Sequence, residues 1–344
     1  MGAPPDDPYA RARKGVSPEA AALFEDALVW DMTLPWGTPC AEPDVTLPRF
    51  QAASVDLISL TVQDGQETGV AEAVRHMARV TRDIAERADR MVLCRTADDI
   101  LAAKAAGKLA LIFNHQETNP LEGRVEMVQA YYDLGVRHIL LAYNKRNRAG
   151  DGCAEATDAG LSRFGIRAVE EMNRVGMLVD GTHCGYRTSM EAIEVSSAPV
   201  IFSHCDAHAV FPHYRNIRDD QIKACAAAGG VIGVNGVGAF LGDAEASTES
   251  MFRHIDHMTR LVGAEHVGIG LDYLRDTDRF WTQMKRTPEL WPLIDGKPHQ
   301  ATRFVQPEQL VELTDLMLER GYAAADVRGI LGGNFLRLAR QVWK

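Results

Sequence analysis

Short apolar runs alternate with helical segments along most of the chain, and this alternation limits the possible folds more than any other feature of the sequence. Eight runs are too short for helices, and several are rich in β-branched residues; they span residues 28–32, 55–62, 109–114, 138–144, 177–180, 199–204, 230–235 and 266–272. The pattern predicts an α/β fold, a (β/α)8 TIM-type barrel. An open doubly wound sheet is the main competitor, but no glycine-rich phosphate fingerprint follows an early run.

The predicted barrel accounts for nearly the whole chain of 344 residues. We expect residues 16–344 to form a single barrel domain that ends in a closing pair of helices. Residues 1–15 are polar and proline-rich, which predicts a flexible N-terminal arm. The first helix is expected just after Ser17, because serine is a good N-cap and Pro18 suits the first helical position.

Composition excludes several classes of function. The formal net charge of -10 argues against a nucleic-acid or anionic-membrane partner. No run of about 18 apolar residues is present, and the N-terminus lacks the apolar region of a secretory signal, so no membrane span is expected. The six scattered cysteines predict reduced thiols in a cytoplasmic protein; they are Cys40, Cys94, Cys153, Cys184, Cys205 and Cys225.

Polar side chains follow several of the apolar runs directly, at the point where a strand would end. In a (β/α)8 barrel the active site lies at the carboxyl ends of the strands, so we expect these groups to gather at one mouth. His183 and His204 follow consecutive runs. Neighbouring strands lie about 4.8 Å apart, so the two imidazoles can converge on one ion. Imidazole nitrogen favours zinc, and a purely structural pair of histidines is the alternative.

Five segments, residues 131–147, 150–185, 199–235, 266–273 and 332–343, resemble the membrane dipeptidase (renal dipeptidase) family of zinc peptidases, peptidase family M19, within the amidohydrolase-like barrels. They include "YYDLGVRHILLAYNKRN", "MLVDGTHCG" and "HVGIGLDY", and they occur in the family's order. The resemblance extends from about residue 28 to the C-terminus. The "GDGC" version of the second segment resembles a bacterial branch of the family.

The resemblance implies a site built for two zinc ions. In the family, one ion is bound by a histidine and an aspartate from an N-terminal motif, and the other by two histidines from strands five and six. His183 and His204 match those two histidines. Arg215 matches the arginine that holds the substrate carboxylate, and Asp272 matches an aspartate near the substrate amino group. Tyr143 stands where the family has a histidine that assists at the scissile carbonyl.

The sequence departs from the family at the first ion. Asp31 fits the leading aspartate of the N-terminal motif, but Thr33 and Pro35 stand at the positions of the ligand histidine and the ligand aspartate. Proline has no donor atom in its side chain, and a neutral hydroxyl is a poor ligand. Gln116 replaces the glutamate that bridges the two ions. Glu117 would restore a carboxylate only through a one-residue slip, which normally turns a side chain to the other face, so Gln116 is favoured.

A reduced site with a single zinc ion is therefore expected, bound by His183, His204 and Gln116. One zinc ion is sufficient for hydrolysis, because it lowers the pKa of bound water and polarises a carbonyl group. Asp272 is the first choice for the general base. Asp180 is expected to orient His183 through its second ring nitrogen.

Three residues are assigned to substrate binding, namely Arg215, Asn144 and Glu155. The planar fork of Arg215 suits a carboxylate, and an ion pair with Asp219 or Asp220 is the structural alternative. Glu155 is also a candidate ligand or general base, and a solvated loop carboxylate is its structural alternative.

We expect a metal-dependent hydrolase that cleaves an amide bond in a dipeptide-like or N-acyl amino acid substrate. Two alternatives remain open at this point: a barrel enzyme that performs another reaction on a small carboxylate, and a non-catalytic relative that binds a ligand. The partner is expected to be a small molecule with a carboxylate, and a homodimer is expected by analogy with the family.

Overall fold

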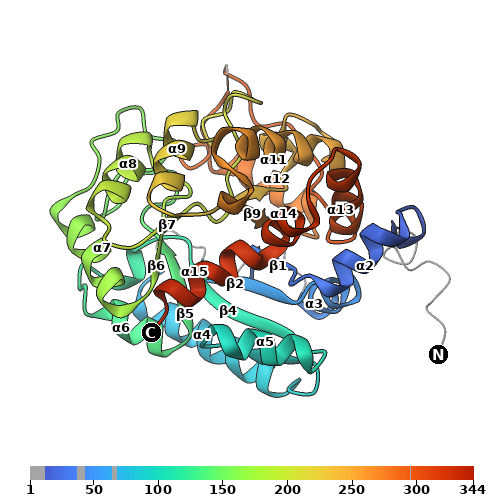
Figure 1. Ribbon diagram of the computed structural model, residues 1–344. Coiled ribbons are helices and arrows are strands. Elements are labelled where there is room, and N and C mark those ends of the chain that lie inside the picture. Colours follow the sequence, from blue (N-terminus) through green and yellow to red (C-terminus); the bar gives the residue numbers. More distant parts are fainter. Residues whose placement is uncertain (1–11, 37–42, 64–67, 295) are drawn as a thin grey trace.

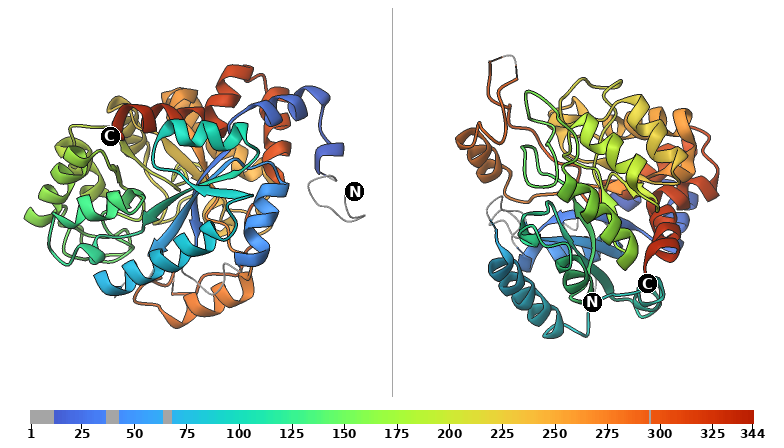
Figure 2. Two further views of the ribbon diagram at one scale, coloured as in Figure 1. Left: turned by 90° about the horizontal axis from the view of Figure 1, so that it is seen from below. Right: turned by 90° about the vertical axis from the view of Figure 1, so that its left-hand side faces the viewer.

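Eight parallel strands form a nearly closed barrel, with helices outside the strands (Figure 1, Figure 2). The computed structural model describes every residue except 1–11, 37–42, 64–67 and 295. The strands are β1 (Trp30–Pro35), β2 (Leu57–Gln63), β4 (Leu109–His115), β5 (Val136–Leu140), β6 (Leu178–Asp180), β7 (Val200–Ile201), β8 (Ile232–Asn235) and β9 (Val267–Gly270). They lie in the order β7-β6-β5-β4-β2-β1-β9-β8, and each corresponds to one predicted run. The predicted (β/α)8 barrel is confirmed.

Closure between β7 and β8 depends on close backbone contact. A parallel bridge joins Phe202 to Ile232, just beyond the end of β7. A Cβ atom on Gly233 would lie 2.1 Å from the carbonyl oxygen of Ser203, and one on Gly270 would lie 2.0 Å from it. Only glycine at these two positions lets the end of β7, which carries His204, approach β8 and β9 this closely.

A ninth strand in the described residues, β3 (Met91–Leu93), is absent from the predicted runs. It pairs with the first half of β4, from Met91↔Leu109 to Leu93↔Leu111, whereas β5 pairs with the second half from Phe113 onward. Three residues carry too little periodicity to indicate a strand without their partner.

The helices follow the strands as the sequence predicts. Ser17 caps α2, because its hydroxyl accepts a hydrogen bond from the amide of Ala20. Four helices, α3, α5, α10 and α12, were not among the predicted helical segments. The helices are α2 (Pro18–Asp26), α3 (Pro43–Ala52), α4 (Val70–Ala85), α5 (Ala97–Ala105), α6 (Met127–Asp133), α7 (Arg163–Val175), α8 (Tyr186–Val195), α9 (Asp219–Ala227), α10 (Gly238–Leu241), α11 (Thr248–Val262), α12 (Thr277–Arg286), α13 (Gln309–Glu319), α14 (Ala324–Arg328) and α15 (Asn334–Val342), with short helical turns η2 (Asn119–Leu121), η3 (Ala264–His266) and η4 (Gly329–Gly333).

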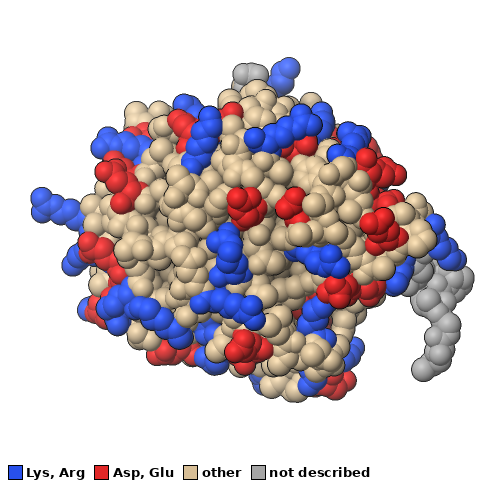
Figure 3. Space-filling view, in the orientation of Figure 1, with Lys and Arg blue, Asp and Glu red and all other residues tan. Residues whose placement is uncertain are grey.

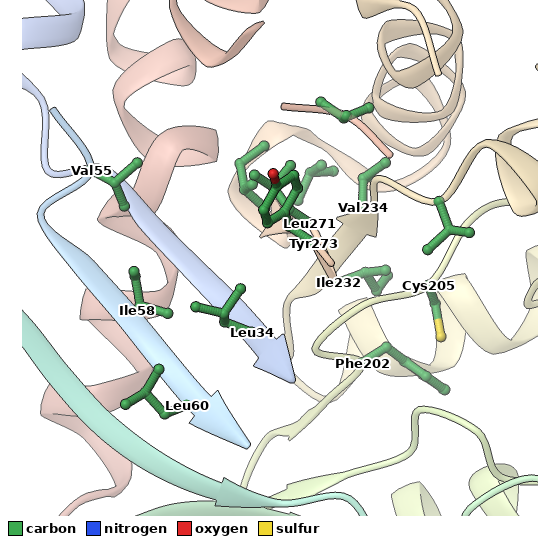
Figure 4. Packing of buried hydrophobic residues seen from close by; sticks show 14 of the residues in the cluster. Leu34, Val55, Ile58, Leu60, Phe202, Cys205, Ile232, Val234, Leu271 and Tyr273 are labelled. Carbon is green, nitrogen blue, oxygen red and sulfur yellow. The ribbon is translucent and has the colours of Figure 1, made fainter. Parts of the chain in front are cut away.

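Two apolar clusters hold the barrel together. The larger one lies mainly between strands and helices, and Figure 4 shows part of it, including Leu34 and Leu60 on β1 and β2 and Val234 on β8. The smaller one joins residues at the amino ends of strands, such as Trp30 and Leu57, to the buried face of α15. The C-terminal helix therefore closes the amino end of the barrel, and the carboxyl end is left for the site.

Several other sequence-based expectations concern the surface and the termini. Basic and acidic side chains are interspersed over the face shown in Figure 3. Within the described ranges, no helix combines the length and the apolar character needed to cross a bilayer. Five cysteines are free thiols, and Cys40 lies outside the described residues. Residues 1–11 of the predicted N-terminal arm also lie outside them, so the arm stays a prediction.

Candidate active site

Three polar residues just after the carboxyl ends of strands have a left-handed backbone. They are Asn144 after β5 (φ 54°), His183 after β6 (φ 65°) and Asp272 after β9 (φ 54°). Such conformations cost on the order of 1–3 kcal/mol for residues other than glycine, and they cluster at active sites. Asn144 and His183 are buried and Asp272 is half-buried, so the surrounding structure holds them in place. These strained positions mark this mouth of the barrel as the candidate active site.

The two predicted histidines meet at this mouth. Nε2 of His183 lies 3.0 Å from Nε2 of His204, and both rings are buried. Their strands β6 and β7 are paired neighbours, as the sequence predicts. The remaining question is which ring nitrogens carry the protons.

Asn144 determines the proton position on His183. Its Oδ1 lies 2.7 Å from Nδ1 of His183, and its Nδ2 donates to the carbonyl oxygen of Leu290 at 3.1 Å. The second bond fixes the orientation of the amide, so the oxygen faces the ring. Nδ1 of His183 is therefore the N–H donor, and the lone pair is on Nε2.

Two hydroxyl groups determine the proton position on His204. Its Nδ1 lies 3.0 Å from Oγ1 of Thr33 and 2.8 Å from Oγ of Ser203. The Thr33 hydroxyl donates to the carbonyl oxygen of Met32 at 2.6 Å, and the Ser203 hydroxyl donates to Oγ1 of Thr182 at 3.4 Å. Both hydroxyl protons point elsewhere, so Nδ1 of His204 is the donor and its lone pair is also on Nε2.

Two lone pairs therefore face each other across 3.0 Å in a buried space. Burial lowers the pKa of both His183 and His204 well below the ordinary range, and the nearby charge of Arg215 lowers it further, so a bridging proton is disfavoured. Two nitrogens bound to one tetrahedral zinc ion at about 2.0–2.1 Å would be separated by roughly 3.3 Å. The pair therefore fits a zinc ion. Among the described residues, no group of three or more His, Cys, Asp and Glu side chains is arranged to hold a metal.

Gln116, predicted as the third ligand, lines a cavity of about 110 Å3 over this mouth together with Tyr143 and Asp272. Its Nε2 donates to Oγ1 of Thr61 at 3.3 Å, which orients the amide. Glu117 is not among the lining residues. Gln116 is therefore the one of this neighbouring pair that faces the cavity, while its role as a ligand stays a prediction.

Asp272 is the predicted general base. Burial raises its pKa to about 7, against the lowering effects of Arg215 and of the hydrogen bond from Asn235 Nδ2, which is 3.4 Å long. A carboxylate with this pKa is half ionised at neutral pH, as a general base needs. Burial also raises the pKa of Asp31 to about 8.

Arg215 lies in a second pocket of about 250 Å3, which His183 also lines. Its guanidinium contacts the carbonyl oxygen of His204 at 3.3 Å and Sγ of Cys205 at 3.8 Å, and it lies over the ring of Phe240. Nε of Arg215 is buried and has no hydrogen-bond partner, and within the described part of the chain no ion pair forms with this guanidinium. The alternative pairing is not observed, because Asp219 contacts His257 and Asp220 contacts Tyr186.

The loop between β5 and α7 carries Glu155 into the same pocket. Its Oε1 accepts a hydrogen bond from the amide of Arg146 at 2.6 Å, so the carboxylate also stabilises the loop. A Cβ atom on Gly152 would lie 2.1 Å from the backbone of Asn144, which explains the glycine in the "GDGC" segment. This close contact holds the loop against the residue that orients His183.

The family model for membrane dipeptidase (Peptidase family M19) matches residues 40–294. The chain belongs to this family. Proteins with similar sequences include an uncharacterized dipeptidase C965.12 of Schizosaccharomyces pombe, which is 32% identical over 77% of this chain and 62% of that protein. Dipeptidase tcpJ of Claviceps purpurea is 30% identical over 74% of this chain and 56% of that protein. The chain thus spans about three fifths of the length of these relatives.

A solved structure, an amidohydrolase from Pseudomonas aeruginosa, is 27% identical and superimposes with a TM-score of 0.82 over 94% of this chain and 99% of that chain. The expectation of a bacterial branch is not borne out, since the curated relatives named above are fungal.

Three residues, Thr33, Pro35 and Gln116, stand at positions that the family resemblance assigns to metal ligands. The Thr33 hydroxyl forms hydrogen bonds with the carbonyl oxygen of Met32 and with Nδ1 of His204. Pro35 lines the cavity together with Gln116. The three replaced positions thus lie at the same mouth, and none supplies an imidazole or a carboxylate.

One sequence-based assignment is corrected by the geometry. Asp180 does not contact His183: its Oδ2 accepts from Nδ1 of His138 at 3.0 Å, and its Oδ1 accepts from the amides of Thr182 and Ser203. Asn144 orients His183 in its place, and the assignment of Asn144 to the substrate stays a prediction. The fold of two loops brings Asn144 and His183 together, and no pattern in the sequence signals it.

Proposed function

We propose that this membrane dipeptidase family member is a metal-dependent hydrolase that cleaves an amide bond in a dipeptide-like or N-acyl amino acid substrate at a single zinc ion. The observation that carries the proposal is the pair of Nε2 lone pairs of His183 and His204, which face each other across 3.0 Å. Neutral imidazole is a preferred zinc ligand, and the rings are fixed from behind by Asn144 and Thr33.

The restriction to one ion rests on Thr33, Pro35 and Gln116. These residues stand where the family resemblance places a histidine, an aspartate and a bridging glutamate. Gln116 keeps an amide oxygen, so it remains the proposed third ligand of the single ion.

Each proposed site residue would have a separate role in hydrolysis. A bound zinc ion supplies a Lewis acid and lowers the pKa of water. Asp272 accepts the proton of the attacking water at its carboxylate and returns it to the leaving nitrogen. The phenol of Tyr143, which stacks on His183 with ring centroids 4.0 Å apart, serves as a donor to the scissile carbonyl oxygen. Arg215 binds the substrate carboxylate with its buried guanidinium. Glu155 lines the same pocket and restricts the size of the carboxylate end of the substrate.

Metal analysis of the purified protein, combined with a hydrolysis screen over dipeptides and N-acyl amino acids, tests the proposal. We expect about one zinc ion per chain and hydrolysis that a chelator abolishes. His183→Ala and His204→Ala should each lose the ion and the activity, whereas His257→Ala, which changes a histidine paired with Asp219, should retain both. Two ions per chain, or unchanged metal content in both site variants, contradicts the single-ion site.

The free thiols of the five described cysteines support a reducing, cytoplasmic compartment, which we propose as the location. A homodimer also stays a proposal, and sedimentation of the purified protein tests it.

A further inference from the structure

We propose that the cavity above Asp272 is a subsite for a large apolar group on the acyl side of the scissile amide. Resting on the proposed hydrolase function, this inference names the substrate class. The preferred substrates are small carboxylates whose amide carries a bulky apolar acyl group, either an aromatic or branched acyl chain or an N-terminal residue of that kind.

Six side chains give the cavity an apolar wall. It is formed by Phe240, Leu274, Phe280, Met284, Leu290 and Trp291, which come from α10, the end of β9, α12 and the chain after it. Trp291 stacks on Phe240 with ring centroids 6.3 Å apart and an interplanar angle of 13°, and it meets the edge of Phe280 at 6.5 Å. Aromatic rings that support one another in this way form a wall that needs little reordering when a ligand binds.

The polar lining residues fall into two groups. Gln283 and Thr287 belong to α12 and its C-terminal end. Gln116, Tyr143 and Asp272 all come from the carboxyl ends of strands, where the reaction is proposed to occur. A group held between the two walls therefore has one side toward the reacting carbonyl and the other toward Trp291. Apolar surface removed from water there contributes roughly 25 cal/mol per Å2.

The position of Arg215 decides which end of the substrate enters the cavity. Arg215 lies in the other pocket, and His183 lines that pocket as well. Tyr143 stacks on His183 and lines the cavity, so the two rings stand between the two spaces. A substrate with its carboxylate at Arg215 and its amide at the histidines must extend its acyl group past Tyr143 into the cavity.

The size of the cavity agrees with this assignment. The space in it that a water-sized sphere can reach is about 110 Å3, and one water molecule needs roughly 10–15 Å3 of such space. A methyl group would leave most of this space unfilled beside apolar side chains, whereas a phenyl or branched chain would fill it. Good filling of an apolar space favours the larger ligand.

Two ligands that cannot be hydrolysed test the subsite directly. The compounds 4-oxopentanoate and 5-phenyl-4-oxopentanoate are ketone analogues of N-acetylglycine and N-phenylacetylglycine, with the same carboxylate and different acyl ends. We expect titration calorimetry on the zinc-loaded protein to show that the phenyl compound binds more tightly, on the order of 10- to 100-fold.

Variants locate the effect. Trp291→Ala and Phe280→Ala should each reduce the ratio of the two affinities, and Arg215→Ala should weaken both ligands alike. Leu293→Ala, two residues from Trp291 and 51% exposed, should leave the ratio unchanged. If a cavity variant does not fold, the comparison of the two ligands on the unaltered protein still decides.

The outcomes separate the two proposals. Equal affinities for the two ketones, with hydrolysis observed in the substrate screen, overturn the apolar subsite and leave the hydrolase intact. Failure of both ketones to bind a zinc-loaded protein, together with no hydrolysis, overturns the proposed function and the subsite with it.

Discussion

Thr33 places its hydroxyl oxygen 3.0 Å from Nδ1 of His204. In the family resemblance, the same position belongs to a histidine that binds the first ion. Here the residue contacts the back of a histidine that is proposed to bind the second ion. The position that the resemblance assigns to a ligand of the first ion would therefore orient a proposed ligand of the second.

Replacement of Thr33 by valine should weaken zinc binding. Valine keeps the shape and removes one of the two acceptors for Nδ1–H of His204, leaving Ser203. Loss of such outer partners typically costs about 10- to 100-fold in metal affinity. Competition with a chromophoric chelator measures the affinity. Thr33→Ser keeps a hydroxyl and should stay within a few-fold of the unaltered protein; equal weakening by serine and valine would mean that packing, not the hydrogen bond, is responsible.

Loss of Arg215 should raise KM for substrates that carry a carboxylate. The guanidinium is buried and has an unpartnered Nε, so it is available for an anion. A charged hydrogen bond is worth about 1.5–3 kcal/mol, so Arg215→Ala should raise KM by roughly 10- to 100-fold. Steady-state kinetics on an acid and on its neutral amide provides the control. An equal effect on both would indicate a role in folding.

The activity should depend on the ionisation of Asp272. Because burial raises its pKa to about 7, the base form is lost as the pH falls below this value. The quantity kcat/KM should then fall about tenfold per pH unit below pH 7 and level off above it. Asp272→Asn should reduce the rate by about 100- to 10,000-fold. An acid limb near pH 7 that persists in this variant would belong to metal-bound water instead.

Stability should respond to the buried carboxyl group of Asp31. Its pKa rises from 3.8 to about 8 on folding, so the folded state holds a proton that the unfolded chain releases. That contribution is fully present below pH 3.8 and is lost as the pH rises through about 8.

Asp31→Asn removes this titration and keeps an oxygen for the amides of Leu271 and Thr33. Relative to the unaltered protein, the variant should gain at least about 1 kcal/mol of unfolding free energy between pH 5 and pH 8, measured by urea denaturation without metal. Asp89→Asn, at a site 76% exposed, is the control and should show no such gain. A difference that does not vary with pH would contradict the assigned pKa.

The sequence was sufficient to predict the barrel because its strands are buried on both faces and therefore read as continuous apolar runs. All seven residues of β4 are buried, for example. The strand β3 was missed because its three residues gain strand character only through pairing with β4. The helix α3 contains Pro48, and a proline inside a segment argues against a helix when the sequence is considered alone.

The site was predictable where it depends on strand ends and not where it depends on loops. His183 and His204 follow paired strands, so their convergence could be predicted. Asn144 and His183 are separated by 39 residues, and their contact depends on two left-handed residues that the sequence does not reveal. Asp180 was assigned to His183, but it lies on β6 beside β5 and pairs with His138 of that strand.

The two hydrogen bonds made by the side-chain amide of Asn144 have a consequence for how the protein would retain a bound zinc ion. One amide joins the carbonyl of Leu290, in the segment that walls the cavity, to the ring of His183. Displacement of that segment frees the amide to rotate and to present its nitrogen to the ring, which favours the opposite tautomer and withdraws the lone pair. Entry of a substrate and loss of the zinc ion would then both require displacement of this segment, at the same cost in free energy. Ligands that stabilise the undisplaced segment should therefore also slow the loss of zinc.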